Sequence, residues 1–218
     1  MTVQLLDITL ISAGYLLGSV ASAIVVCRIW SLPDPRLQGS GNPGATNVLR
    51  IGGKAPAAAT LIGDVLKGLV PVSVGHGLGA AETTVAVIAL AAFLGHLYPV
   101  FFNFQGGKGV ATAFGALIGL DLWAALLVLS VWLTVVLLTR LSSLAALSAS
   151  LLAPVILWLL DQPHAHSVAL AMMSILLIWR HQANIQRLLT GQESRIGDKS
   201  SIDASIGGKR SKDQRGRT

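Results

Sequence analysis

The stretch LWAALLVLSVWLTVVLLT, residues 122–139, decides the class of fold. It contains no Asp, Glu, Lys, Arg or His. Its length is close to the roughly 20 apolar residues that an α-helix needs to cross a bilayer. The stretch therefore predicts a transmembrane helix.

The composition of the whole chain agrees with membrane residence. Of the 218 residues, 53% are hydrophobic and 12% are charged, whereas soluble domains carry about 25% charged residues. This composition excludes an ordinary soluble globular domain. The single cysteine, Cys27, excludes an intrachain disulfide.

We expect an all-α integral membrane protein, a bundle of seven transmembrane helices. The expected spans are Leu5–Cys27, Ala57–Leu78, Thr84–Phe102, Val110–Leu120, Leu122–Thr139, Ser143–Leu160 and Ser167–Trp179. The fourth span is short, so it should be tilted or buried among its neighbours. We expect the first span to be a retained helix and not a signal peptide, because no basic residue precedes Arg28.

The distribution of Lys and Arg predicts the orientation. With seven spans and the N-terminus outside, 15 of the 16 basic residues fall on the cytoplasmic side, together with the C-terminus. A six-span alternative would place Arg140 and the tail opposite Arg28. The net charge of +6 therefore reflects topology and does not indicate a nucleic-acid partner.

The chain divides into two parts of unequal size. Residues 1–196 are expected to form a single polytopic membrane domain that carries cytoplasmic active-site loops. Residues 197–218 are rich in Gly, Ser, Lys, Arg and Asp without apolar periodicity, which predicts a basic, disordered cytoplasmic tail.

The sixteenth basic residue, Lys67, lies within the second span, three residues after Asp64. Positions i and i+3 share a helix face, so the two side chains can pair. Ionisable groups within a span usually face the protein interior or a water-filled cavity. A structural ion pair and a supporting role in a site both remain open.

The first inside loop contains GSGNPGATNVLR, residues 39–50. Its G-x-G-x-x-G spacing is not a dinucleotide fingerprint, because no strand precedes it and Pro43 interrupts it. Glycines allow backbone N–H groups to approach an anion, and Arg suits bidentate phosphate binding. A tight turn would explain the glycines but not the polar residues, so we predict phosphate binding by Ser40, Gly41, Asn42, Thr46, Asn47 and Arg50.

The second inside loop contains QGGKG, residues 105–109, and leads into a helix. It departs from the Walker motif at Phe102 and Gly109. Free amides at a helix N-terminus nevertheless attract anions. We predict phosphate binding by Gly106, Gly107, Lys108 and Gly109.

The last inside segment places His181 and Asn184 at the end of the seventh span, on one helical face. A histidine of near-neutral pKa can act as acid, base or hydrogen-bond donor, although an interfacial polar role is the simpler alternative. Of the other four histidines, His96 is expected to pack in the middle or outer half of its span, and His164 and His166 to lie in the outer loop. His76 is also expected to have no role in the site. No metal cluster and no cofactor are expected.

Three motifs together resemble the bacterial acyl-phosphate-dependent glycerol-3-phosphate acyltransferase family (PlsY-type). They are GSGNPGATNVLR, the run GHLYPVFFNFQGGKGVAT over residues 95–112, and RHQANIQRLLTGQE over residues 180–193. The resemblance extends from the first span to Gly197. It implies an enzyme of the bacterial cytoplasmic (inner) membrane, multi-pass, with its active site facing the cytoplasm.

The resemblance implies transfer of a fatty acyl group from acyl phosphate to the 1-hydroxyl of glycerol 3-phosphate, giving lysophosphatidic acid and phosphate. The implied catalytic residues are His181, Asn184 and Ser143, with Asp64, Lys67 and Glu193 as candidates for supporting roles. Either His181 or a substrate phosphate would take the hydroxyl proton. The implied partners are the two substrates, bilayer lipid and the soluble enzyme that makes acyl phosphate (PlsX-type).

Two alternatives to this enzyme stay open at this point. Asp64 and Lys67 within a span would suit a transporter of a phosphorylated small solute, and a non-catalytic phosphate-binding scaffold has the same loops. The His-x₄-Asp pair of other glycerolipid acyltransferases is missing. The residues five positions after the histidines are Ala81, Phe101, Ala169, Ala171 and Gln186.

Overall fold

The computed structural model describes residues 5–196, which form ten α-helices and one short 3₁₀ helix, with no β-strand in that range. The first half contains α1 (Leu5–Gly18), α2 (Ser22–Ile29), α3 (Ala45–Gly52), α4 (Lys54–Gly77), α5 (Glu82–Leu97) and η1 (Val100–Phe102). The second half contains α6 (Val110–Leu120), α7 (Leu122–Thr139), α8 (Ser142–Leu159), α9 (His164–Arg180) and α10 (Gln182–Leu189). The expected tail, 197–218, lies outside the described residues.

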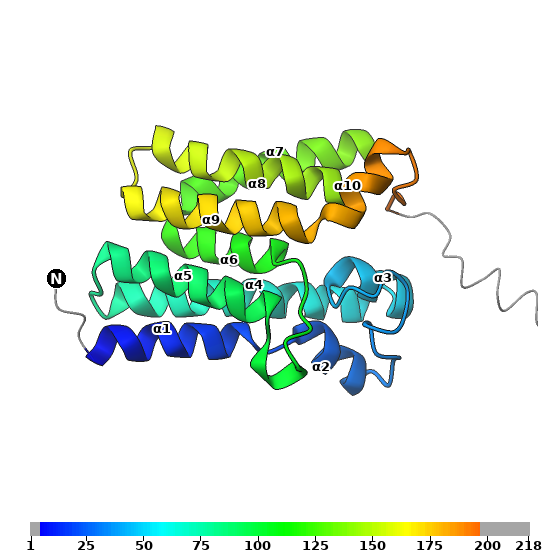
Figure 1. The fold of residues 1–218 in the computed structure, drawn as a ribbon, viewed down its shortest axis with the longest axis horizontal. Helices are drawn as coiled ribbons and strands as arrows, with labels where there is room; N and C mark the ends of the chain where they lie inside the picture. Colours follow the sequence, from blue (N-terminus) through cyan, green and yellow to red (C-terminus); the bar gives the residue numbers. More distant parts are fainter. Residues whose placement is uncertain (1–4, 197–218) are drawn as a thin grey trace, which may run out of the picture.

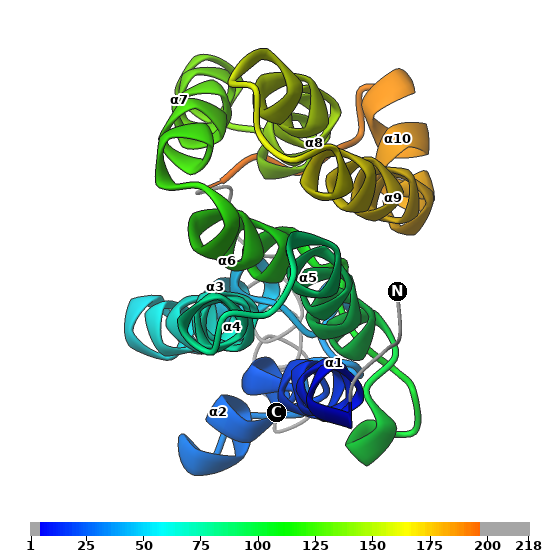
Figure 2. The same cartoon turned by 90° about the vertical axis from the view of Figure 1, so that its left-hand side faces the viewer.

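The long helices lie side by side in two groups, with α6 between them (Figures 1 and 2). Helices α1, α4 and α5 pack together and contact α6 through α4 and α5, and α7, α8 and α9 lie on the other side and contact α6 through α7 and α9. The short helices α3 and α10 lie at the same end of the bundle (Figure 1). Loops that are distant in sequence therefore meet at that end.

Glycines let the helices of the first group approach closely. A Cβ atom on Gly18 of α1 would lie 2.1 Å from the carbonyl oxygen of Ala92, and one on Gly95 of α5 would lie 2.3 Å from that of Tyr15. Gly68 and Gly115 make the same reciprocal contact between α4 and α6. Small residues at interfaces are how membrane helices gain packing contacts without a hydrophobic driving force.

The expected spans are confirmed as helices, but the count of seven is not. Four spans are long and apolar enough to cross a membrane: α4, Glu82–Phe102, α7 and α8. The count rises to six if the bent pairs α1–α2 and α9–α10 each form one span, and α6, with 11 residues, is shorter. As predicted, α6 is held among its neighbours.

Two predictions about these segments were wrong. The first span is not continuous, because the helix breaks between Gly18 and Ser22 with a bend of 44°. The segment 45–52, predicted as loop, is the helix α3. The predicted end of the seventh span, Trp179, agrees with the end of α9 to within one residue, and the chain bends there by 61° into α10.

Candidate active site

A cavity of about 740 Å³ extends from the loops beside α3 and α10 into the space between α6 and helices α7 to α9. Its polar end is lined by charged and hydroxyl side chains, which include Ser40, Thr46, Arg50, Lys108, Ser143, Arg187 and Arg195. Its deeper end is lined by apolar side chains, among them Leu117, Val128, Trp132, Ala153, Leu170 and Met173. The cavity therefore offers a cationic mouth and an apolar interior.

Most of the predicted site residues meet on this one surface, although they come from loops far apart in sequence. The predicted residues on the cavity wall are Ser40, Asn42, Thr46, Asn47, Arg50, Asp64, Lys108, Gly109, Ser143, His181, Asn184 and Glu193. Four predicted residues are not on the wall: Gly41, Lys67, Gly106 and Gly107.

The carboxamide of Asn47 holds the first loop together. Its Oδ1 accepts a hydrogen bond from the backbone N–H of Ser40 at 2.9 Å, and its Nδ2 donates to the carbonyls of Pro35 and Gln38 at 2.8 and 3.0 Å. Asn47 is 2% exposed. These three bonds occupy the amide, so it shapes the loop that presents Ser40.

Close packing explains the glycines of the second loop. A Cβ atom on Gly106 would lie 2.0 Å from the carbonyl oxygen of His96, and one on Gly107 would lie 2.3 Å from His96 Nε2. The guanidinium of Arg180 donates to the carbonyls of Gly106 and Gly107 at 3.0 and 3.3 Å. The loop is thus fixed between α5 and α9, with Lys108 directed to the cavity.

A hydrogen-bond network centred on Glu193 joins the second loop to the last. Lys108 Nζ donates to Asn184 Oδ1, and Asn184 Nδ2 donates to Glu193 Oε1 at 2.5 Å. Ser143 Oγ donates to the same carboxylate oxygen at 2.8 Å, and Arg187 Nε donates to Oε2 at 2.7 Å. Glu193 therefore sets the positions of three side chains on the cavity wall.

The electrostatics of this network follow from burial and from the surplus of positive charge. Desolvation lowers the pKa of Lys108 to about 8; the carboxylate of Glu193 opposes this shift, while Arg187, Arg180 and Arg50 add to it. Burial would raise the pKa of Glu193, but hydrogen bonds from Asn184, Ser143 and Arg187 outweigh it and hold that pKa low. An anion would stabilise the cationic form of Lys108.

His181 presents an unprotonated nitrogen to the cavity. Its Nδ1 lies 2.8 Å from the carbonyl oxygen of Leu177. Because a carbonyl only accepts, Nδ1 carries the proton of the neutral ring and Nε2 keeps a lone pair. Desolvation, reinforced by the charge of Lys108, lowers the pKa of His181 to about 4 although the Leu177 bond opposes the shift. His181 is therefore neutral near pH 7 and can accept a hydrogen bond.

Lys67 lies at the break in the first span. Its Nζ lies 2.9 Å from Asp64 Oδ1 and donates to the carbonyl of Val20 at 2.9 Å. Val20 is one of the non-helical residues between α1 and α2, where the regular helical hydrogen bonding is interrupted. Lys67 thus ties α4 to the break, whereas Asp64 reaches the cavity wall.

Several residues of the wall were not predicted from the sequence, and His96 is the clearest case. It was placed in the middle or outer half of its span, but it lies in the last turn of α5, at the site end of the bundle. Its Nδ1 lies 3.1 Å from Thr112 Oγ1 and 3.6 Å from Asp64 Oδ1. The motif that begins at Gly95-His96 was the sequence feature that could have indicated a place for His96 at the site. The other missed polar residues are Ser142, Arg187, Ser194 and Arg195.

Within residues 5–196, no three histidine or carboxylate side chains on this wall converge as metal ligands would. The wall instead combines guanidinium, ammonium, hydroxyl and amide groups with an apolar channel. Fold and site together define a helical membrane protein whose cavity suits an anionic group joined to a long apolar chain.

Comparison with known proteins gives the family. Residues 8–191 match the family described as glycerol-3-phosphate acyltransferase. The glycerol-3-phosphate acyltransferase of Thioalkalivibrio sulfidiphilus is 55% identical over 197 residues, which cover 90% of this chain and 97% of the relative. That of Shewanella loihica is 53% identical over 205 residues, which cover 93% and 99%.

Solved structures agree with this result. The crystal structure of PlsY (YgiH), an integral membrane glycerol 3-phosphate acyltransferase, in its glycerol 3-phosphate form is 37% identical, with a TM-score of 0.84. The match covers 91% of this chain and 98% of that one. The lysophosphatidic acid form is 36% identical, with a TM-score of 0.82 and coverages of 90% and 98%. The chain therefore belongs to the glycerol-3-phosphate acyltransferase family of the PlsY type, which confirms the resemblance found from its motifs.

Proposed function

We propose that this chain transfers a fatty acyl group from acyl phosphate to the 1-hydroxyl of glycerol 3-phosphate, releasing lysophosphatidic acid and phosphate. The observation that carries the proposal is the continuity of one cavity from a cationic mouth to an apolar interior. Both the acyl donor and the product join a phosphate to a long apolar chain. The acyl chain of the donor would lie between α6 and helices α7 to α9. The phosphates of acyl phosphate and glycerol 3-phosphate would lie among the loops.

Arg50 and Lys108 supply the positive charge for those phosphates. Arg50 offers a planar guanidinium for bidentate binding and is oriented by its Nη2 donating to Ser194 Oγ at 2.7 Å. Lys108 offers a point charge on the same cavity wall. Donors fixed in advance stabilise the negative charge that develops on the carbonyl oxygen and on the leaving phosphate. Ser40, Ser143 and Asn184 add uncharged donors.

The reaction needs no covalent enzyme intermediate, because phosphate is a good leaving group. The glycerol hydroxyl oxygen forms a bond to the acyl carbon, and the bond from that carbon to the phosphate oxygen breaks. His181 Nε2 accepts the hydrogen bond of the hydroxyl and orients it. With its pKa near 4, His181 is a weak base, so we assign the proton to the departing phosphate.

Several residues act through others. Asn47 holds the loop that carries Ser40, Arg180 holds the loop that carries Lys108, and Glu193 orients Ser143 and Asn184. We assign these three residues positioning roles. Lys67 contacts the carbonyl of Val20 and the carboxylate of Asp64. These contacts favour a structural role for Lys67 over the transporter alternative.

Purified protein in detergent, given synthetic acyl phosphate and labelled glycerol 3-phosphate, should form labelled lysophosphatidic acid. Acyl-CoA in place of acyl phosphate should give little product, which tests the choice of donor. Absence of product from both donors, in protein that unfolds cooperatively, would overturn the proposed activity. Product formed from acyl-CoA but not from acyl phosphate would contradict the assignment of acyl phosphate as the donor.

We also propose that the cavity mouth faces the cytoplasm of a bacterial inner membrane, as the Lys and Arg distribution favours. The soluble enzyme that makes acyl phosphate could then deliver its product at this face. Basic side chains at the mouth, such as Arg187 and Arg195, supply charge for such docking.

A further inference from the structure

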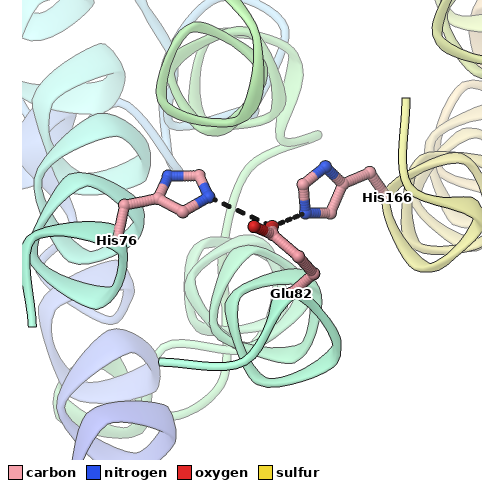
Figure 3. A group of neighbouring side chains, drawn as sticks. All are labelled: His76, Glu82 and His166. Carbon is pink, nitrogen blue, oxygen red and sulfur yellow. Dashed lines mark hydrogen bonds and ion pairs between the residues drawn. The ribbon is translucent and has the colours of Figure 1, made fainter. Parts of the chain in front are cut away.

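Three side chains from three helices meet at the other end of the bundle (Figure 3). His76 comes from the last turn of α4, Glu82 from the first turn of α5 and His166 from the first turn of α9. His166 and His181 lie at opposite ends of α9, about 22 Å apart at 1.5 Å per residue. The cluster is therefore separate from the cavity mouth and does not depend on the proposed activity.

The distances within the cluster suit a shared metal ion. Glu82 Oε2 lies 3.0 Å from His166 Nε2 and 3.4 Å from His76 Nε2. One ligand atom from each of the three residues lies within 4.8 Å of the others. Tetrahedral Zn²⁺, with bonds of about 2.0–2.2 Å, separates its ligand atoms by roughly 3.3–3.5 Å. The contact between Glu82 and His76 falls within that range, and the contact between Glu82 and His166, at 3.0 Å, is slightly shorter.

The tautomer of His76 also suits metal binding. Its Nδ1 lies 3.1 Å from the carbonyl oxygen of Gly119, and because a carbonyl only accepts, Nδ1 carries the proton. The Nε2 of the neutral ring then directs a lone pair toward the carboxylate of Glu82. In that tautomer two acceptors face each other, and either a proton on Nε2 or a metal ion has to lie between them. Histidines that bind a metal through one ring nitrogen usually donate the N–H of the other to a backbone carbonyl, a carboxylate or water.

The surroundings of His166 give a second reason to place a metal ion here. It is 2% exposed, and among the described residues neither ring nitrogen makes a hydrogen bond of acceptable geometry, although Nε2 lies close to Glu82. A buried polar group without a partner is costly. Its ring and that of His76 approach edge to face, with centroids 6.1 Å apart. Both rings direct nitrogen atoms toward the same carboxylate (Figure 3).

We propose that His76, Glu82 and His166 bind a divalent transition-metal ion, with Zn²⁺ as the best match to two imidazoles and one carboxylate. The ion would join α9 to the α4–α5 hairpin, and so would link the two groups of helices at the end remote from the cavity mouth. From the sequence no metal is expected, and His166 is expected to lie in the outer loop. The fold corrects that placement, because His166 lies within α9 and is buried.

The test uses the full chain in detergent, without a polyhistidine tag and stripped with a chelator. Calorimetric titration with ZnCl₂ should show saturable binding of one ion per chain. Saturating Zn²⁺ should raise the unfolding temperature by about 5 °C. His166→Gln and His76→Gln should each weaken binding at least tenfold. His164→Gln is the matched control, because His164 is an exposed histidine two residues away on the same helix; it should bind as the wild type does.

Co²⁺ gives a second measurement, since tetrahedral coordination produces strong visible absorption. That absorption should appear with the wild type and with His164→Gln, and should be lost with His166→Gln. If His166→Gln folds poorly, Glu82→Gln provides the same test, because this side chain is 53% exposed. No saturable binding to the wild type, or wild-type affinity in both His76→Gln and Glu82→Gln, would show that the cluster is only an ion pair and would overturn the proposal.

Discussion

Lys108 Nζ donates a hydrogen bond to Asn184 Oδ1, although the two residues are 76 positions apart in the chain. The bond joins the glycine-rich loop before α6 to α10, and Glu193 extends it to Ser143 on α8. One network thus assembles the cavity mouth from three separate segments. A change at any of its members is expected to affect the others.

The first prediction concerns the two phosphate-binding cations. Lys108→Ala and Arg50→Ala should each lower kcat/KM at least tenfold, which corresponds to about 1.4 kcal/mol of transition-state stabilisation. Steady-state kinetics with both substrates measure this. Lys54→Ala is the matched control, because Lys54 also follows two glycines but is exposed and lies away from the cavity wall. Equal rates for Lys108→Ala and Lys54→Ala would contradict the role of Lys108.

The second prediction is a pH dependence. The pKa of Lys108 is lowered to about 8, so the free enzyme loses this cation as the pH rises through 8. If Lys108 must be charged, kcat/KM should be roughly tenfold lower at pH 9 than at pH 7. In Lys108→Arg the fall of kcat/KM at alkaline pH should move to higher pH, because the guanidinium stays protonated. If an active Lys108→Arg variant lost kcat/KM at the same pH as the wild type, deprotonation of Lys108 would be excluded as the cause of the loss.

The third prediction separates orientation from proton transfer at His181. His181→Ala removes the Nε2 acceptor and should lower kcat at least tenfold. His181 already has a pKa of about 4, so its protonation should not limit the wild-type rate between pH 6 and 8. A profile of kcat against pH checks both statements. His164→Ala, at the other end of α9, should behave as the wild type, whereas full activity of His181→Ala would remove His181 from the mechanism.

The fourth prediction concerns packing under the second loop. In Gly107→Ala the added Cβ would lie 2.3 Å from His96 Nε2 and 3.0 Å from the carbonyl oxygen of Pro43. Overpacking of this kind costs about 1–3 kcal/mol and should displace Lys108. Thermal unfolding and the KM for glycerol 3-phosphate should both change. Gly77→Ala is the control, because its Cβ would meet nothing within 4 Å; a similar loss there would refute the steric explanation.

The fifth prediction tests the orientation in the membrane. In a Cys27→Ser background, His164→Cys should react with an impermeant maleimide added outside intact cells. Gln192→Cys should react only after the membrane is permeabilised. Both positions are exposed, whereas native Cys27 is buried. The reverse pattern would contradict the positive-inside assignment.

The sequence by itself determined the class of fold and the chemistry of the loops. Runs such as Leu122–Thr139 can satisfy their backbone groups in a bilayer only as helices, and the observed helix has those bounds. Glycine, Arg50 and Lys108 indicated anion binding because residue type fixes charge and hydrogen-bonding capacity. The family also follows from the motifs, since their residues are local in sequence.

Only the tertiary structure decided which of these residues share one surface and what each one contacts. Asn47 and Lys67 carry polar groups as suitable as those of Ser40 and Lys108, but backbone carbonyls of the folded chain engage them. His96 and His166 reach their neighbours through the packing of α5 and α9, which no local pattern encodes. The physical reason is that hydrogen-bond partners and burial depend on segments far away in the chain. Hydrophobic periodicity and charge, in contrast, are properties of the segment itself.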